Sequence, residues 1–136
     1  KKLARKNSNI KFMGGFDNKK IAEVFTEIDV LVAPSIWQEN SPLVIQEAFA
    51  GRVPVIASDI GGISELIKDG YNGFLFKAGD AEDLFVKMQM IINSPSLLND
   101  IAQNITPPKS IEENARETEV IYRSLLCKPE PASASS

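Results

Sequence analysis

Apolar residues follow two patterns that alternate along the chain. Short continuous runs are typical of strands in a parallel sheet, whereas spacing of i, i+3, i+4 and i+7 is typical of helices. The continuous runs are at 30–33, 53–57 and 74–76, and a further short strand is expected at 10–13. We expect helices at about 21–28, 42–50, 63–69, 81–93, 95–103 and 111–126. The alternation predicts an α/β fold, a Rossmann-like parallel sheet with flanking helices and right-handed crossovers.

Polar residues mark where two of these helices begin. Asp80 stands directly before the helix predicted from 81 and can cap its first N–H groups. Ser110 and Glu113 have the spacing of a capping box, in which each side chain bonds the backbone N–H of the other residue. We therefore expect the last helix to begin at this pair.

The helix predicted at 42–50 has almost no polar side, so we expect it to be buried all round. Ser41 is a good N-cap, Pro42 suits the first helical position, and Gly51 is the expected left-handed residue at the end. Glu47 interrupts the apolar pattern. A buried carboxylate needs a partner, which is either a protein group or a ligand.

Composition narrows the class of protein. With 136 residues, 43% of them hydrophobic and 24% charged, the chain has the size and composition of one globular domain or a part of one. A net charge of −3 gives no reason to expect a nucleic-acid partner. The single cysteine excludes a disulfide framework, and no cysteine pair suggests zinc. Neither a signal peptide nor a membrane-spanning run is visible in the sequence.

The predicted sheet brings three loops to one edge. Ligands bind beyond the carboxyl ends of parallel strands, where we expect the loops at 14–16, 34–41 and 58–62. The middle loop leads into a helix whose first N–H groups and dipole suit a phosphate. Glu39 and Glu47 would repel a phosphate and are better placed to accept hydrogen bonds from hydroxyls. A sugar nucleotide offers both kinds of group.

Each of these features also has a purely structural interpretation. Glu47 can pair with Arg52, the glycine pair at 61–62 can simply turn the chain, and Trp37 can be a lid over the core. These alternatives stay open for each residue taken alone. The combination of all the features favours a ligand site.

One long stretch resembles a known family. The sequence P-S-I-W-Q-E-N-S-P-L-V-I-Q-E-A-F-A-G-R-V-P-V-I-A-S-D-I-G-G-I-S-E-L-I-K-D-G-Y-N-G-F-L-F resembles the donor-binding domain of the family-4 retaining glycosyltransferases of GT-B fold, also called glycosyl transferases group 1. The earlier N-I-K-F-M-G resembles the preceding strand, so the likeness covers about residues 9–92. Such proteins often have Gly-Phe-Gly where this chain has Asn40-Ser41-Pro42, which stiffens the loop.

The resemblance implies a role for each part of the site. Glu39, the implied catalytic residue, contacts the transferred sugar, whereas Glu47 holds the ribose hydroxyls. The backbone at 41–44 meets the sugar and the diphosphate, and the segment 14–16 cradles the base. The implied donor-binding residues are Glu47, Asn40, Ser41, Pro42, Leu43, Val44, Gly14, Gly15 and Phe16. The family needs neither a metal nor a cofactor, because its nucleotide-diphosphate sugar is the donor substrate.

The resemblance also implies that the chain is a fragment. We expect residues 1–126 to be part of a C-terminal donor-binding domain, without its first strands and without the loops that carry an Arg and a Lys for the diphosphate. Residues 127–136 are expected to be a disordered tail. The acceptor, a glycan or a lipid, would be bound by a missing N-terminal domain. The parent would transfer a hexosyl group to an acceptor hydroxyl with retention of configuration, and the isolated fragment would be inactive.

Two other functions remain open on the sequence. One is a nucleotide-sugar epimerase of similar fold, and the other is a non-catalytic module that binds sugar nucleotides. We expect the protein in the cytoplasm or at the periphery of a membrane, and the sequence leaves membrane association undecided. It names neither the sugar, the base nor the acceptor.

Overall fold

The sheet at the centre of the molecule has three parallel strands, as the computed structural model shows for residue 4 and residues 7–126. The strands are β1 (Leu31–Ala33), β2 (Val55–Asp59) and β3 (Phe74–Lys77), in the order β1-β2-β3. Leu31 lies opposite Val55, and Ile56 lies opposite Phe74. The predicted α/β fold with a parallel sheet is confirmed.

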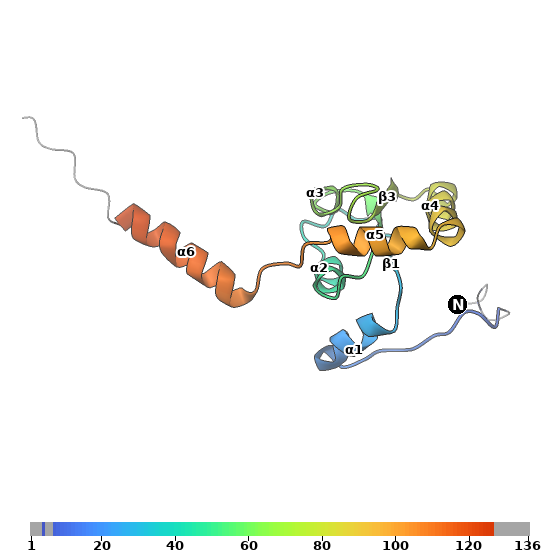
Figure 1. The fold of residues 1–136 in the computed structure, drawn as a ribbon, viewed down its shortest axis with the longest axis horizontal. Coiled ribbons are helices and arrows are strands. Elements are labelled where there is room, and N and C mark those ends of the chain that lie inside the picture. The colour runs from blue at the N-terminus through green and yellow to red at the C-terminus, as the bar shows by residue number, and fades with distance from the viewer. Residues whose placement is uncertain (1–3, 5–6, 127–136) are drawn as a thin grey trace, which may run out of the picture.

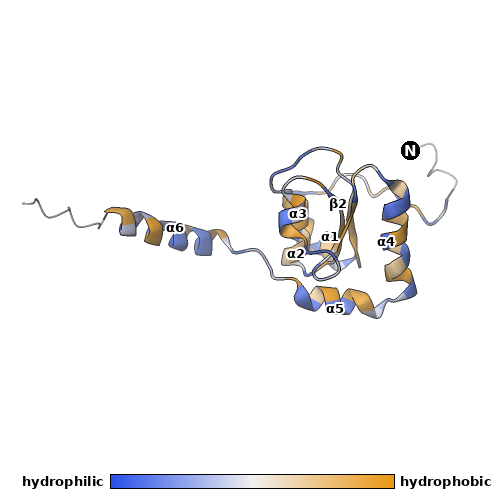
Figure 2. Ribbon diagram, turned by 90° about the horizontal axis from the view of Figure 1, so that it is seen from above, coloured by the Kyte–Doolittle hydropathy of each residue, from blue (hydrophilic) through white to orange (hydrophobic). Residues whose placement is uncertain are grey.

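Helices cover both faces of this sheet. The helical elements are η2 (Asn18–Lys20), α1 (Ile21–Thr26), α2 (Leu43–Ala50), α3 (Ile63–Leu66), α4 (Ala81–Asn93), α5 (Ser96–Asn104) and α6 (Ile111–Leu126). Figure 2 shows α2 and α3 on one side of the strands and α4 on the other. The helix expected at 63–69 ends early, because the backbone is already extended at Ile67.

The amino ends of the strands are closed by α5. Ile101 and Ile105 from this part of the chain are 1% and 2% exposed, and they belong to the same apolar core as Val55 and Ile63. The side-chain amide of Asn104 donates a hydrogen bond of 3.1 Å to the carbonyl of Tyr71, in the turn before β3. The turn before β3 is thus tied to α5, and the loops that leave the carboxyl ends of the strands lie at the opposite edge (Figure 2).

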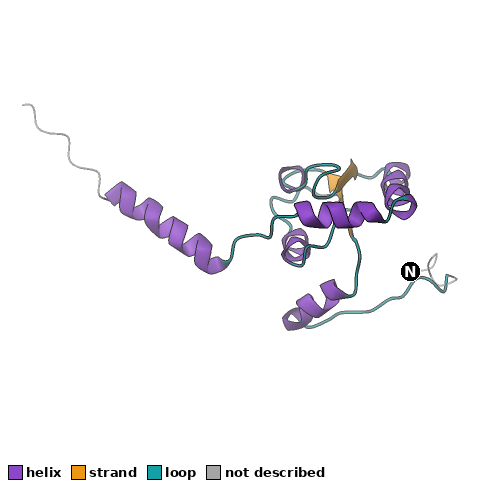
Figure 3. Cartoon of the chain, viewed as in Figure 1, coloured by secondary structure: helices purple, strands orange, loops and turns teal. Residues whose placement is uncertain are grey.

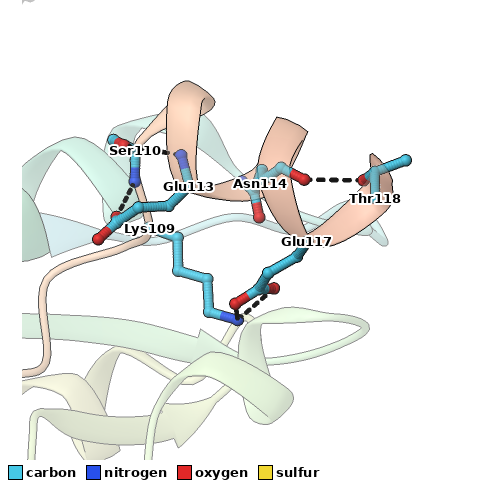
Figure 4. A network of polar contacts seen from close by, with 6 residues as sticks. All are labelled: Lys109, Ser110, Glu113, Asn114, Glu117 and Thr118. Carbon is cyan, nitrogen blue, oxygen red and sulfur yellow. Dashed lines mark hydrogen bonds and ion pairs between the residues drawn. The ribbon is translucent and has the colours of Figure 1, made fainter. Parts of the chain in front are cut away.

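The two predicted caps are confirmed. Asp80 Oδ1 accepts hydrogen bonds from the backbone N–H of Glu82 and of Asp83 at the start of α4. At the start of α6, Ser110 N–H donates to Glu113 Oε2 over 2.8 Å, and Glu113 N–H donates to Ser110 Oγ over 3.1 Å (Figure 4). Local sequence therefore determines both helix starts.

Helix α6 projects away from the rest of the molecule, as Figures 1 and 3 show. Every residue of Ile111–Leu126 is exposed, and Ile111 and Leu126 are 85% and 84% exposed. Apolar and polar residues are interspersed along it in Figure 2. The predicted tail at 127–136 lies outside the described residues.

The prediction of a strand at 10–13 is wrong. These residues are irregular, and the side chains of Phe12 and Met13 are 59% and 81% exposed. A strand is stable only when its N–H and C=O groups pair with a neighbour. Within the described residues β1 pairs with β2 alone, so the apolar run at 10–13 has no strand beside it.

The expectation that α2 is buried all round is also wrong. Ile45, Ala48 and Phe49 are buried, whereas Leu43 and Val44 are 71% and 42% exposed. The helix thus has one face in the core and one face outside it.

Helix α2 starts one residue later than predicted and ends at Ala50, before Gly51, as predicted. The N-cap position is occupied by Pro42 rather than Ser41, and no side chain caps the helix. At the other end, Gly51 has a φ of −83°, and the following Arg52 takes the left-handed value of 55°. The helix therefore begins without the side-chain bond that a serine cap would supply.

Candidate functional site

The loop between β1 and α2 is held by two hydrogen bonds to Glu39. Ser35 Oγ donates to Glu39 Oε1 over 2.8 Å, which fixes the half-buried carboxylate at one end of the loop. The backbone N–H of Gly62 donates to the carbonyl of Glu39 over 2.8 Å. The second bond joins this loop to the one that follows β2, so two loops at the carboxyl edge form one unit.

Gly61 and Gly62 do more than turn the chain. A Cβ atom placed on Gly62 would lie 1.8 Å from the carbonyl oxygen of Asn40, and one placed on Gly61 would lie 2.9 Å from that of Glu39. Gly61 also has a φ of 56°, which disfavours other residues. The glycines thus allow the backbones of the two loops to touch.

The start of α2 presents unpaired backbone donors. Within the described residues, the N–H groups of Leu43 and Val44 have no hydrogen-bond acceptor, and both residues are exposed. Ser41 Oγ accepts a hydrogen bond from the side-chain amide of Gln46, one turn into the helix. Free N–H groups and the positive end of the helix dipole make this position suitable for an anion.

Glu47 lies in a hollow between α1 and α2. The hollow has a volume of about 360 Å³ and is lined by Ile21, Ala22, Phe25, Thr26, Glu47, Ala50 and Gly51. Among the described residues the carboxylate of Glu47 has no hydrogen-bond or ion-pair partner, so the predicted alternative of a Glu47–Arg52 pair is wrong. The half-buried carboxylate is therefore available to accept hydrogen bonds from a ligand.

The segment expected to cradle the base lies on a different side of α1. Gly14 and Phe16 line a second hollow of about 520 Å³, together with Val24, Glu27 and Ile28 of the helix and its end. The residues that α1 contributes to the Glu47 hollow are different ones. Thus Glu39, the start of α2 and the glycine loop come together, whereas Gly14 to Phe16 do not join them here.

Two features of the site were not apparent from the sequence. Ser35 holds the carboxylate of Glu39, although in a loop without helical spacing no sequence pattern links these two residues. Trp37 is 74% exposed and is not a lid over the core.

No group of three or more His, Cys, Asp or Glu side chains within the described ranges is arranged to hold a metal ion.

The fold is that of GT-B glycosyltransferases. The chain is similar to sucrose-phosphate synthase from Thermosynechococcus elongatus, with a TM-score of 0.78 and 27% identity, over 92% of this chain and 33% of that one. It is also similar to the Anabaena protein HepE in complex with UDP and glucose, with a TM-score of 0.75 and 25% identity, over 86% of this chain and 33% of that one.

The sequence identifies the family. The model of the family described as "Glycosyl transferases group 1" matches residues 1–106, and the chain belongs to this family. An uncharacterized glycosyltransferase of Methanocaldococcus jannaschii is 33% identical over 97 residues, which are 71% of this chain and 27% of that protein. Family membership favours the transferase over the epimerase and over the non-catalytic module.

The matched part of the chain spans 16% to 27% of the length of the first three curated relatives, and a third of the two solved structures described above. No helix formed by the described residues combines the length and the apolar character needed to cross a bilayer.

Proposed function

We propose that the chain is part of the donor-binding C-terminal domain, residues 1–126, of a retaining family-4 glycosyltransferase. The whole protein transfers a hexosyl group from a nucleotide-diphosphate sugar to the hydroxyl of a glycan or lipid acceptor. The acceptor is bound by an N-terminal domain, and the enzyme acts in the cytoplasm or at the periphery of a membrane. The observation that carries the proposal is the start of α2, where unpaired N–H groups lie in a loop unit that also holds the Glu39 carboxylate.

The chemistry of donor recognition follows from this arrangement. The N–H groups of Leu43 and Val44 bind the diphosphate, and the helix dipole stabilises the negative charge that grows on it as the glycosidic bond breaks. Glu39 accepts hydrogen bonds from the hydroxyls of the transferred sugar, and Glu47 accepts them from the ribose. The base is assigned to Gly14, Gly15 and Phe16 on the family resemblance alone, because this segment lies on another side of α1 from the Glu47 hollow. Solved complexes of HepE with UDP and with UDP-glucose support a nucleotide-sugar donor.

Retention of configuration follows from attack on the same face from which the diphosphate departs. The transferred sugar would keep its anomeric configuration in the product, because the acceptor hydroxyl enters where the leaving group exits. No metal takes part in this scheme, since backbone donors and cationic side chains stabilise the diphosphate.

The test is donor binding by the full-length protein and its glutamate variants, measured by calorimetry with UDP, GDP and their sugars. A hydrogen bond to a charged group stabilises binding by about 1.5–3 kcal/mol, so Glu47→Ala should weaken nucleotide and nucleotide sugar alike, by about 10- to 100-fold. Glu39→Ala should leave UDP or GDP binding unchanged and reduce discrimination between sugars.

The matched control is Glu112→Ala, which removes an exposed carboxylate on α6. This variant should bind donor like the wild type. If Glu39→Ala and Glu47→Ala also bind every compound like the wild type, the assignment of the site is wrong.

A further inference from the structure

Trp37 is an exposed aromatic residue in a loop whose backbone is held on both sides. It is 74% exposed. The Ser35–Glu39 hydrogen bond spans it, and the bond from Gly62 N–H to the Glu39 carbonyl fixes the residue two positions further on. The backbone next to it is also in contact, because a Cβ placed on Gly61 would lie 3.5 Å from the Cα of Gln38. The fold thus presents the indole at a defined place.

The residues that follow Trp37 are those that a pyranose ring requires beside an aromatic surface. A pyranose has faces of C–H groups with partial positive charge, which pack on the negative face of an aromatic ring. Its rim has hydroxyls, which bond to amide, carboxylate and hydroxyl groups. Gln38, Glu39, Asn40 and Ser41 supply these groups in succession.

We propose that Trp37 is a stacking platform for a pyranose ring at the carboxyl edge of the sheet. The inference rests on the proposed function and adds to it a residue that determines sugar specificity. The ring is that of the transferred sugar of the donor, because Trp37 stands two residues before Glu39, to which the proposed function gives the hydroxyls of that sugar. The indole is 74% exposed and does not belong to the apolar core that the described residues form.

The indole itself reports on the proposal. Trp37 is the only tryptophan among the 136 residues, so its side-chain N–H gives one assigned signal in an NMR spectrum of the ¹⁵N-labelled chain. The chain is titrated with UDP, with UDP-glucose, and with methyl α-glucoside in the presence of UDP. We expect the Leu43 and Val44 amides to shift with both nucleotides. The indole signal should stay in place with UDP alone and shift with UDP-glucose. A shift with methyl α-glucoside in the presence of UDP would show that a free pyranose ring also stacks there.

Variants separate stacking from a general effect on the loop. Trp37→Ala should lower the affinity for the compound that moved the indole signal by about 3- to 10-fold, as measured from the Leu43 and Val44 amide signals. The affinity for UDP should stay unchanged. Trp37→Phe, which keeps an aromatic face, should retain most of the affinity. Tyr71→Ala is the matched control, because it removes another exposed aromatic residue, in the turn before β3, and should change nothing.

The outcomes distinguish this inference from the proposed function. If the amides at the start of α2 shift while the indole stays in place with every sugar, or if Tyr71→Ala weakens binding as much as Trp37→Ala, Trp37 is not a stacking platform. If neither nucleotide shifts the amides, the proposed donor site is wrong and the inference fails with it.

Discussion

Asp69 is a residue whose proton affinity is changed by its neighbours in the fold. Burial raises the pKa of its carboxyl, but a hydrogen bond from the Leu75 N–H and the adjacent Lys87 ammonium together outweigh this effect, so the pKa lies below its ordinary value of 3.8. The Lys87 Nζ lies 2.9 Å from Asp69 Oδ2 and 5.7 Å from the centre of the Phe74 ring. This contact ties the loop before β3 to α4.

Replacing Asp69 with Asn should lower the free energy of unfolding at pH 7 by about 1 kcal/mol, because the ion pair is lost while an acceptor for Leu75 remains. A folded-state pKa that is lowered means that the contribution of Asp69 is present above its ordinary pKa of 3.8 and is lost as the pH falls through the folded-state value. Urea unfolding at pH 7 and at pH 3 checks this. The difference between wild type and variant should narrow at the lower pH, and a constant difference would contradict the explanation.

The loop after β1 and the loop after β2 act as a single element. Their backbones meet at Gly62, whose φ of −68° is accessible to any residue, so space rather than conformation requires a glycine there. The glycine pair stands in the stretch that resembles the family, yet the atom that Gly62 meets, the carbonyl of Asn40, lies more than twenty positions earlier in the chain. Only the fold brings the two together.

Gly62→Ala should lower the free energy of unfolding by about 1–3 kcal/mol, because the added methyl group collides with the Asn40 backbone and must push the loops apart. Under the proposed function it should also weaken donor binding, since Glu39 and the start of α2 move with the loop. Chemical unfolding and a UDP-glucose titration measure the two effects.

Gly79→Ala is the control for this variant. Gly79 has a φ of 78° and nothing within 4 Å of an added Cβ, so alanine there adds about 1–2 kcal/mol of backbone strain without a collision. It should destabilise the fold and leave donor binding unchanged. Equal loss of binding in both variants would show that general destabilisation explains the effect of Gly62→Ala.

The whole molecule exposes several apolar surfaces. The second edge of β1 pairs with no strand among residues 7–126, the segment 10–13 is exposed, and α6 contributes no buried side chain. Free strand edges and exposed apolar residues favour association with another chain or domain. The matched region is also only a third of the length of the solved neighbours described above.

We therefore expect negligible transferase activity from these 136 residues alone, because the proposed enzyme needs an acceptor domain in addition to this donor half. The measurement is the release of UDP from UDP-glucose, and of GDP from GDP-mannose, in the presence of simple glycosides. A full-length member of the family serves as the positive control. Turnover by the isolated chain above the rate of spontaneous hydrolysis would contradict the expectation.

Local interactions made much of the fold predictable. Asp80 and the Ser110–Glu113 pair cap their helices with residues two or three positions away, so the sequence alone places α4 and α6. The continuous apolar runs that became β1, β2 and β3 likewise reveal a parallel sheet, since both faces of such strands are covered. Glu47 became a site candidate because a carboxylate is unusual in so apolar a helix, whereas Glu39 and the start of α2 were candidates because they lie at the expected carboxyl edge of the sheet.

The remaining features depend on contacts between distant residues, and only the tertiary structure decided them. The run at 10–13 has the composition of a strand and is irregular, because a strand needs a neighbour that the described residues do not supply. The apolar α2 has an exposed side, since packing and not composition determines which face meets the core. Glu47 faces a hollow between two helices instead of pairing with Arg52, and Gly62 meets Asn40 across two loops. The sequence by itself determined the three strands of the sheet, most of the helices and the caps of α4 and α6, because these depend on near neighbours and on residue type. The partners and the exposure of the candidate site residues were decided by the packing of the whole chain.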